Sequence, residues 1–248
     1  MLIYEYEAGS TLTGTDVEGS DVDRIRVVAE DREYVTGLRE LKTVQTKDPD
    51  GDITTYPLRK YARLCAEGNP NLLQGLFAPQ EAVYAATGRA DRAWRHILDA
   101  RPAFVSQRAA QKFRGYASSQ RRRLTGDETN RTNRPELVES HGYDVKFAAH
   151  AYRLAVQGAE FLRTGELILP MHPSSRAIVR AIRKGHFDYS QTLALIDLAI
   201  DELDFAANES DLNLEPDYDR INRALDSAYE EAWGKPHGVL ASRLPFAA

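Results

Sequence analysis

Two hydrophobic patterns divide this chain near residue 88. Before that point, short runs rich in β-branched and aromatic residues alternate apolar with polar positions, which is typical of strands. We expect strands over 2–7, 21–28, 38–46 and 53–56. After it, apolar positions recur at helical spacing. We expect helices over 91–100, 106–124, 143–164, 174–184, 189–208 and 216–233.

These patterns predict an α+β fold, with a small mixed sheet in residues 1–88 and a mainly helical domain in residues 89–248. A further helix is expected from Leu58, because Leu58, Tyr61 and Leu64 share one side, and it should stop near Gly68. Asp91 is expected to cap the first helix of the second domain, and Gly165 to end the long one.

Composition changes this picture only in part. The chain has 248 residues, 42% of them hydrophobic, and no apolar run long enough to cross a membrane. Cys65 is the single cysteine, and no charged-then-apolar leader is evident, so a cytoplasmic protein is expected. A net charge of −5 argues against a general nucleic-acid coat. Residues 101–134 are nevertheless basic and 197–231 acidic, which leaves a local basic surface open.

The candidate chemistry lies close to the N-terminus. Gly9-Ser10 follows the first strand, and Asp21 and Asp23 stand at i and i+2 in the second strand run. Acids at this spacing point to one face of a strand, where their repulsion calls for a cation. Mg²⁺ prefers carboxylate oxygens and leaves positions for substrate phosphates. The glycine allows close backbone approach, and the serine can hold phosphate oxygens.

Four ordered phrases carry a resemblance that covers the chain up to about Pro170. They are Gly9-Ser10…Gly14…Ser20-Asp21-x-Asp23, Asp52-Ile53-Thr54-Thr55-Tyr56-x-Leu58-Arg59-Lys60, Asn69-Pro70-Asn71-Leu72-Leu73 and His141-Gly142-Tyr143-Asp144-x-Lys146-Phe147-Ala148-x-His150. The first phrase resembles the signature of the DNA polymerase β nucleotidyltransferase superfamily. The set is similar to the YcgL/RlaP group of predicted nucleotidyltransferases. Arg24 and Gly51 depart from the pattern, since both stand where the superfamily usually has apolar residues.

The resemblance implies an Mg²⁺-dependent enzyme that transfers a nucleoside monophosphate from an NTP to an acceptor hydroxyl and releases pyrophosphate. Two Mg²⁺ ions, or Mn²⁺ in their place, would be held by the catalytic acids Asp21, Asp23 and Asp52. Asp52 fits the third acid that the superfamily supplies from a neighbouring strand. Asp50 is its rival, and a turn aspartate is the plain alternative.

Nucleotide-binding residues follow from the same resemblance. Gly9, Ser10 and Ser20 would hold phosphates, and Lys146 would lie over the triphosphate with support from His150 or Arg153. From the sequence pattern alone, these three residues share one side of the 143–164 helix at i, i+4 and i+7. A solvated charged face accounts equally for that spacing.

The acceptor stays open between an RNA end, a protein hydroxyl and a small molecule, as does the oligomeric state. The basic run in 101–134 and the association of the similar group with RNA-ligase contexts favour RNA. The alternative function is a non-catalytic protein that binds nucleotide, RNA or a partner through a degenerate nucleotidyltransferase fold. Arg24 motivates it, because a guanidinium could replace a metal ion, although alternation places Arg24 on the strand face opposite Asp21 and Asp23.

Overall fold

The computed structural model describes residues 1–49, 51–84, 86–126 and 134–234. Its centre is a five-stranded sheet in the order β3-β4-β2-β1-β5. The strands are β1 (Leu2–Glu7), β2 (Arg24–Val28), β3 (Val44–Asp48), β4 (Gly51–Pro57) and β5 (Val83–Tyr84). β2 pairs with β4 in parallel and the other neighbours are antiparallel, so the sheet is mixed. The expected α+β class is confirmed.

Three strand boundaries differ from expectation. β2 starts at Arg24, so Asp21 and Asp23 precede the strand instead of lying in it. The strand expected over 38–46 is Val44–Asp48, since pairing with β4 begins at Val44 and residues 38–43 pair with no strand of the sheet. β4 begins at Gly51, two residues before the start of the strand expected over 53–56.

Gly51 explains one departure from the superfamily pattern. Its φ is +147°, and a Cβ at this position would lie 2.2 Å from the backbone oxygen of Val22. Such an approach leaves no room for a side chain. The glycine therefore lets β4 pass directly against the segment that carries Asp21 and Asp23.

The six long helices are confirmed, with ends within a few residues of the predicted ones. They are α5 (Arg89–Asp99), α7 (Arg108–Thr125), α9 (Val145–Thr164), α10 (Pro173–Arg183), α11 (Tyr189–Asn208) and α12 (Tyr218–Trp233). α3 (Leu58–Ala66) follows β4 directly, as expected. Gly165 ends α9 in the left-handed conformation, as predicted. Asp91 lies in the first turn of α5 and is not its cap, because the helix already begins after Gly88.

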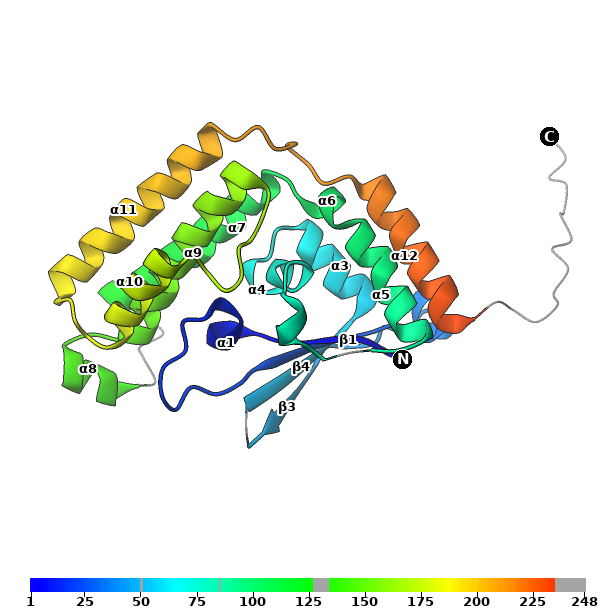
Figure 1. Ribbon diagram of the computed structural model, residues 1–248, viewed down its shortest axis with the longest axis horizontal. Coiled ribbons are helices and arrows are strands. Elements are labelled where there is room, and N and C mark those ends of the chain that lie inside the picture. Colours follow the sequence, from blue (N-terminus) through cyan, green and yellow to red (C-terminus); the bar gives the residue numbers. More distant parts are fainter. Residues whose placement is uncertain (50, 85, 127–133, 235–248) are drawn as a thin grey trace, which may run out of the picture.

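Helices cover one side of the sheet (Figure 1). Tyr4 of β1 stacks on Trp94 of α5 with ring centroids 3.9 Å apart. α12 packs on α5 and α3, and Tyr229 donates a hydrogen bond of 2.6 Å to the buried Glu30 carboxylate after β2. Packing therefore crosses residue 88 at α5 and α12, and the two-domain division stays a prediction.

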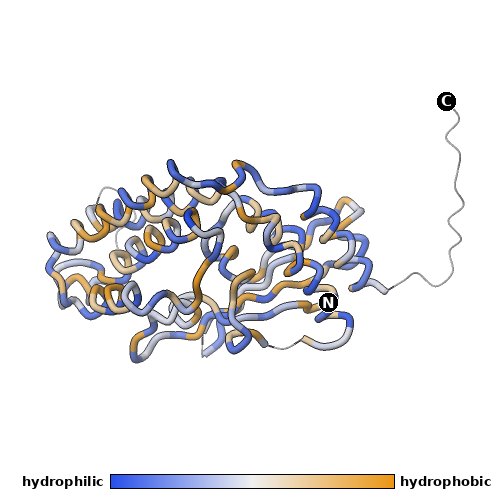
Figure 2. The backbone as a smooth tube through the Cα atoms, turned by 45° about the horizontal axis from the view of Figure 1, so that its top comes forward, coloured by the Kyte–Doolittle hydropathy of each residue, from blue (hydrophilic) through white to orange (hydrophobic). Residues whose placement is uncertain are grey.

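The remaining long helices form a second layer beside the sheet (Figure 1). α9 is its centre and packs on α7, α10 and α11. Gly158 makes this possible, because a Cβ there would lie 2.7 Å from Phe113 of α7 and 2.8 Å from Leu203 of α11. Each helix turns an apolar side inward, which shows as alternating apolar and hydrophilic positions along the backbone (Figure 2).

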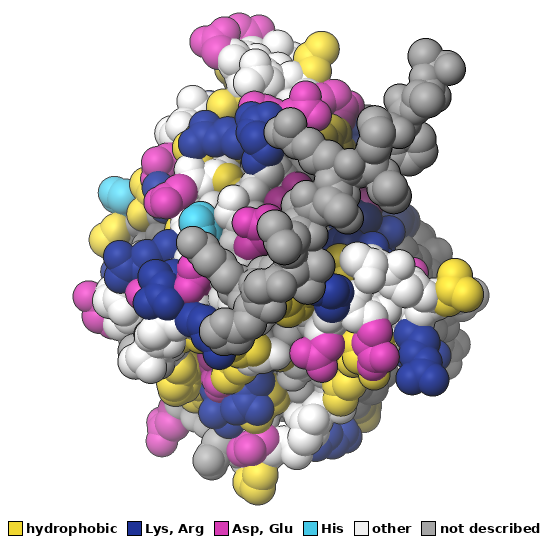
Figure 3. Space-filling view, turned by 90° about the vertical axis from the view of Figure 1, so that its right-hand side faces the viewer, with side chains coloured by type: hydrophobic (Ala, Val, Ile, Leu, Met, Phe, Trp, Pro, Cys, Tyr) yellow, Lys and Arg dark blue, Asp and Glu magenta, His cyan; other side chains and the backbone are white. Residues whose placement is uncertain are grey.

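Arginines of α5 and α7 are matched by acids that come later in the chain. Arg114 and Arg121 of α7 form ion pairs with Asp204 and Asp197 of α11. Arg92 of α5 pairs with Glu231 of α12 at 2.8 Å. At the end of the molecule nearest α12, basic and acidic side chains are interspersed (Figure 3). The basic and acidic stretches of the sequence thus neutralise each other in part, which weakens the case for a basic surface on α7.

No helix in the described part of the chain is long and apolar enough to cross a membrane.

Candidate active site

A pocket of about 610 Å³ lies where the sheet meets the second helical layer. One wall is formed by the start of α1 (Gly9–Thr13), the segment before β2, and β4. The opposite wall is formed by α9, with contributions from α7 and α10. All nine residues predicted to bind nucleotide or metal line it: Gly9, Ser10, Ser20, Asp21, Asp23, Asp52, Lys146, His150 and Arg153.

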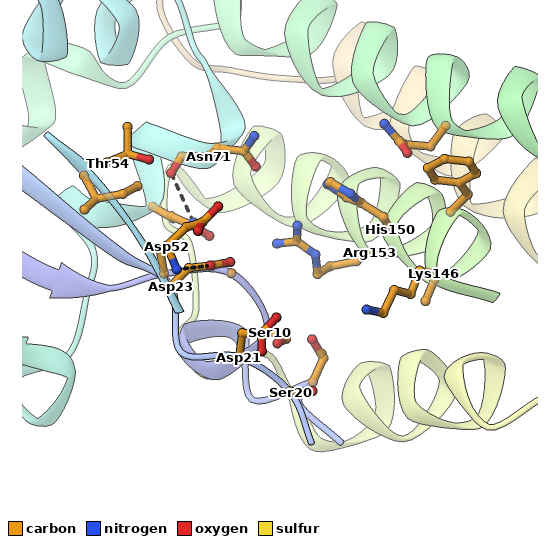
Figure 4. Close-up of a pocket in the computed structure, with 18 of the residues that line it drawn as sticks. Ser10, Ser20, Asp21, Asp23, Asp52, Thr54, Asn71, Lys146, His150 and Arg153 are labelled. Carbon is orange, nitrogen blue, oxygen red and sulfur yellow. Dashed lines mark hydrogen bonds between the residues drawn. The ribbon is translucent and has the colours of Figure 1, made fainter. Parts of the chain in front are cut away.

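The first wall carries the three acids. Asp23 immediately precedes β2, and Asp52 lies on the adjacent β4. The Asp52 backbone N–H points at the Asp23 Oδ1 atom at 3.3 Å, and Gln45 donates a hydrogen bond of 2.7 Å to the Asp52 carboxylate. Figure 4 shows these two acids side by side, with Asp21 closer to Ser10. Asp50, the rival third acid, lies outside the described residues.

The charges on this wall act on each other. The pKa of Asp23 is raised, chiefly by burial and then by the negative charges of Asp52 and Asp21, while the Asp52 N–H and the Lys146 ammonium act against the rise. A carboxylate with a raised pKa beside like charges is stabilised by a bound cation. A bound cation would therefore stabilise the charged form of these acids, and the described residues place no cationic side chain between them.

The carboxylates on this wall supply part of the ligand set of a metal ion. Among the residues that the structure describes, no group of three Asp, Glu, His or Cys side chains is arranged as a complete metal site. Mg²⁺ is commonly held by one or two carboxylates together with substrate phosphates. Asp23 and Asp52 fit that requirement as a pair, with Asp21 lining the same pocket. The donor set suits a metal that arrives with a phosphate ligand.

Gly9 and the loop that follows α1 also line the pocket on the side of the acids. Gly9 has a φ of +66°, and a Cβ on it would lie 3.3 Å from Asp23 Oδ2, so the glycine brings the backbone close to the acid. Ser20 Oγ accepts a hydrogen bond from the Val17 N–H at 3.0 Å. Ser20 therefore shapes the loop, and its hydroxyl can still donate toward the pocket.

The opposite wall is positioned by the first turn of α9. The buried Asp144 carboxylate caps the helix by accepting from the backbone N–H groups of Lys146 and Phe147 at 2.9 and 3.1 Å. This capping holds the backbone of Lys146, the first residue on the polar side of α9, in a defined position. The Lys146 and Arg153 side chains point from α9 toward the wall that carries the acids (Figure 4).

Arg153 is only 9% exposed. Its one hydrogen bond within the described residues joins Nη1 to Gln157 Oε1 at 3.2 Å, and it forms no ion pair there. Burial lowers the pKa of the guanidinium to about 10, so it remains charged at neutral pH. Buried cations are normally paired with an anion. An anionic ligand in the pocket would supply that partner.

His150 lies one turn before Arg153. Burial lowers the pKa of its imidazole to about 3, and the charges of Arg153, Arg123 and Arg134 contribute. The ring is therefore neutral at neutral pH. Its Nε2 atom is buried and has no hydrogen-bond partner among the described residues. Any contact to a ligand is that of a neutral donor or acceptor, and the cationic support comes from its neighbours.

The structure adds cations that the sequence pattern did not single out for this site. Arg134, which precedes α8 (Pro135–His141), lines the pocket, as do Arg123 at the end of α7 and Arg183 at the end of α10. Arg123 and Arg134 both lie over the Phe147 ring, at 5.7 and 4.8 Å from its centroid. Arg123 and Arg134 both belong to the basic stretch 101–134 that left a local basic surface open. Arg183 had no signal in the sequence, because three-dimensional packing brings it here.

The Arg24 side chain is paired with acids other than Asp21 and Asp23. Its guanidinium lies 3.4 Å from Glu5 and 3.6 Å from Asp48. Strand alternation places it with Arg26 and Glu5 on the other sheet face, while Ile25 and Val27 face the core. The guanidinium is thus held by acids of its own sheet and does not stand in for a metal beside Asp23.

Acids on one wall and cations on the other are what a metal–triphosphate complex requires, and the comparison with known families agrees. A profile described as RlaP, RNA repair pathway DNA polymerase beta family, matches residues 1–226. The chain belongs to the RlaP family. A search of curated proteins found no match. Membership in RlaP confirms the nucleotidyltransferase resemblance and extends it beyond Pro170, through α10 and α11 into α12.

Proposed function

We propose that this protein transfers a nucleoside monophosphate from an NTP to an acceptor hydroxyl, with release of pyrophosphate. The observation that carries the proposal is the two-sided pocket. Asp21, Asp23 and Asp52 lie on one wall, and Lys146 and Arg153 point toward them from the other. The RlaP assignment supports the same class of reaction.

The phosphates are bound between these two walls. Lys146 acts as a point charge on the terminal phosphates, and the planar guanidinium of Arg153 can contact two oxygens at once. Gly9 permits close approach of the backbone, and Ser10 and Ser20 offer hydroxyl donors from the loop side. Together these residues would align the α-phosphate for attack by the acceptor.

Asp21, Asp23 and Asp52 are the residues that would hold Mg²⁺, with Mn²⁺ as a substitute. Magnesium bound there would offset negative charge on the phosphates and on the attacking and leaving oxygens. Asp52 is also the acid that we propose to take the proton of the acceptor hydroxyl, since it lines the pocket from β4, beside Asp23.

An RNA end is the acceptor that we propose first. The family description, which names an RNA repair pathway, supports it. The basic stretch in 101–134 no longer does so by itself, because Arg114 and Arg121 are paired with acids of α11. The non-catalytic alternative loses its motivating observation, since Arg24 is paired with Glu5 and Asp48.

The test is incubation with each labelled NTP and Mg²⁺, with and without total RNA. We expect one or more NTPs to label RNA and release pyrophosphate, and chelation of the metal to stop both. Asp23→Asn is the inactive control, because it removes one carboxylate and leaves the side-chain size unchanged. The proposal would be refuted if the Asp23→Asn variant still labelled RNA, or if the wild-type protein labelled no acceptor with any NTP.

A further inference from the structure

The acids and Lys146 account for one end of the pocket and leave a second group of polar side chains without a role. This group consists of Thr54 and Tyr56 on β4, Asn71 on α4 (Pro70–Leu73), Gln74 just after α4, and His150 on α9. None of them carries a charge at neutral pH, since His150 is neutral. Strand alternation places Thr54 and Tyr56 on the same side of β4 as Asp52.

Asn71 is held so that its amide faces the pocket. Its backbone N–H donates to Asn69 Oδ1 at 3.1 Å, and its carbonyl accepts from Gln74 Nε2 at 3.1 Å. Gln74 is itself only 3% exposed, so the turn is fixed from within. The Asn71 side-chain amide has no hydrogen bond to any described residue, and Figure 4 shows it pointing into the pocket. A donor and an acceptor are thus presented together.

His150 provides an independent observation from the opposite wall. Its buried Nε2 atom has no partner within the described chain, and the residue lines the same pocket. An unpaired buried polar atom is energetically unfavourable, so a site of this kind is usually completed by a ligand or by water. Positive charge is already supplied around it by Arg153, Arg123 and Arg134. What the imidazole adds is one neutral donor or acceptor.

We infer that Asn71 and His150 form a nucleoside subsite, which binds the base and ribose of a nucleotide while its phosphates lie at the Ser10–Lys146 end. This rests on the proposed function. A nucleoside suits these groups because its base edge and its hydroxyls both donate and accept hydrogen bonds. The side-chain amide of asparagine pairs well with a base edge. Tyr56, which lines the same pocket, adds an aromatic ring on which a base could stack.

The nucleoside belongs either to the NTP or to the terminal nucleotide of a nucleic-acid acceptor. Binding measurements separate these sources and also separate nucleoside from phosphate recognition. The probes are the four NTPs, inorganic tripolyphosphate, and a short single-stranded RNA with a free 3′-hydroxyl, each titrated into the whole protein with Mg²⁺. The variants are Asn71→Ala and His150→Leu, with His150→Gln as the variant that restores an amide donor and acceptor near the position of Nε2.

We expect Asn71→Ala and His150→Leu each to weaken binding of at least one NTP, or of the RNA, by roughly two- to tenfold, the value of one hydrogen bond. Tripolyphosphate binding should not change, and His150→Gln should recover part of the loss. Asn208→Ala and His186→Leu are matched controls, since both residues are exposed outside the pocket and should have no effect.

Loss of tripolyphosphate binding to the same extent would overturn the inference, because it would mean that these residues hold phosphates or support the fold. Unchanged binding of every probe would overturn it as well. The proposed function fails separately: nucleoside-dependent binding without any transfer of nucleotide would leave the subsite in place and remove the reaction. Loss confined to the RNA would assign the subsite to the acceptor.

Discussion

Removing the Arg153 guanidinium should weaken nucleotide affinity, and removing it together with its Gln157 partner should also raise stability. The guanidinium is buried, and burial lowers its pKa to about 10. A lowering of this size corresponds to about 3 kcal/mol of unfavourable free energy for the charged form in the folded state. Arginine is charged in both folded and unfolded chains at neutral pH, so this cost is fully present there and is relieved only at strongly alkaline pH.

Methionine fills a similar volume and removes that cost, but it leaves the Gln157 amide unpaired. Gln157 is 3% exposed, and an unsatisfied buried amide costs about 1–3 kcal/mol. The single variant should therefore have nearly unchanged or slightly higher stability without ligand. The double variant Arg153→Met/Gln157→Leu removes both polar groups and should be more stable than wild type by about 1–3 kcal/mol.

The assay combines denaturant unfolding in metal-free buffer with NTP titration in Mg²⁺. Both variants should bind NTP more weakly by about 1.5–3 kcal/mol, the value of a hydrogen bond to a charged group. Arg163→Met is the matched control on the same helix: Arg163 is 43% exposed and pairs with Glu202, so its loss should cost about 0–1 kcal/mol of stability and no affinity. A clearly destabilised double variant with full NTP affinity would show that Arg153 serves the fold.

Three further changes test the rest of the site. Asp23→Asn should abolish nucleotide transfer yet raise thermal stability in metal-free buffer at neutral pH. Because folding raises the pKa of Asp23, this gain in stability should disappear as the pH falls below the ordinary aspartate pKa. A variant that is less stable than wild type at neutral pH would contradict this. Lys146→Ala should weaken NTP binding by roughly 1.5–3 kcal/mol and Lys146→Arg should recover part of it, whereas equal affinities would place Lys146 in solvent. Gly51→Ala should destabilise the protein by more than about 1 kcal/mol in a denaturant titration, because its Cβ would overlap the Val22 backbone; unchanged stability would mean that the strands separate at little cost.

Local pattern was enough to predict the elements and the residue types of the site. The long helices follow from apolar spacing at 3.6 residues per turn, and the end of α9 at Gly165 follows from the left-handed conformation that glycine adopts readily. Lys146, His150 and Arg153 share one side of α9 because of their spacing, which no tertiary contact is needed to establish. The strand starts were less predictable, since β2 begins where β4 pairs with it and not where its apolar residues begin.

By itself, the sequence determined which side chains belong together on one element, because backbone periodicity sets that over a few residues. Only the tertiary structure decided what each of them faces. Arg121 and Arg153 are both arginines of long helices, yet packing gives the first a carboxylate of α11 and, among the described residues, leaves the second buried in the pocket with only an amide. Arg134 and Arg183 reach that pocket from separate segments for the same reason. The energy of a charge depends on its burial and on partners distant in sequence, and both are set by how the layers pack.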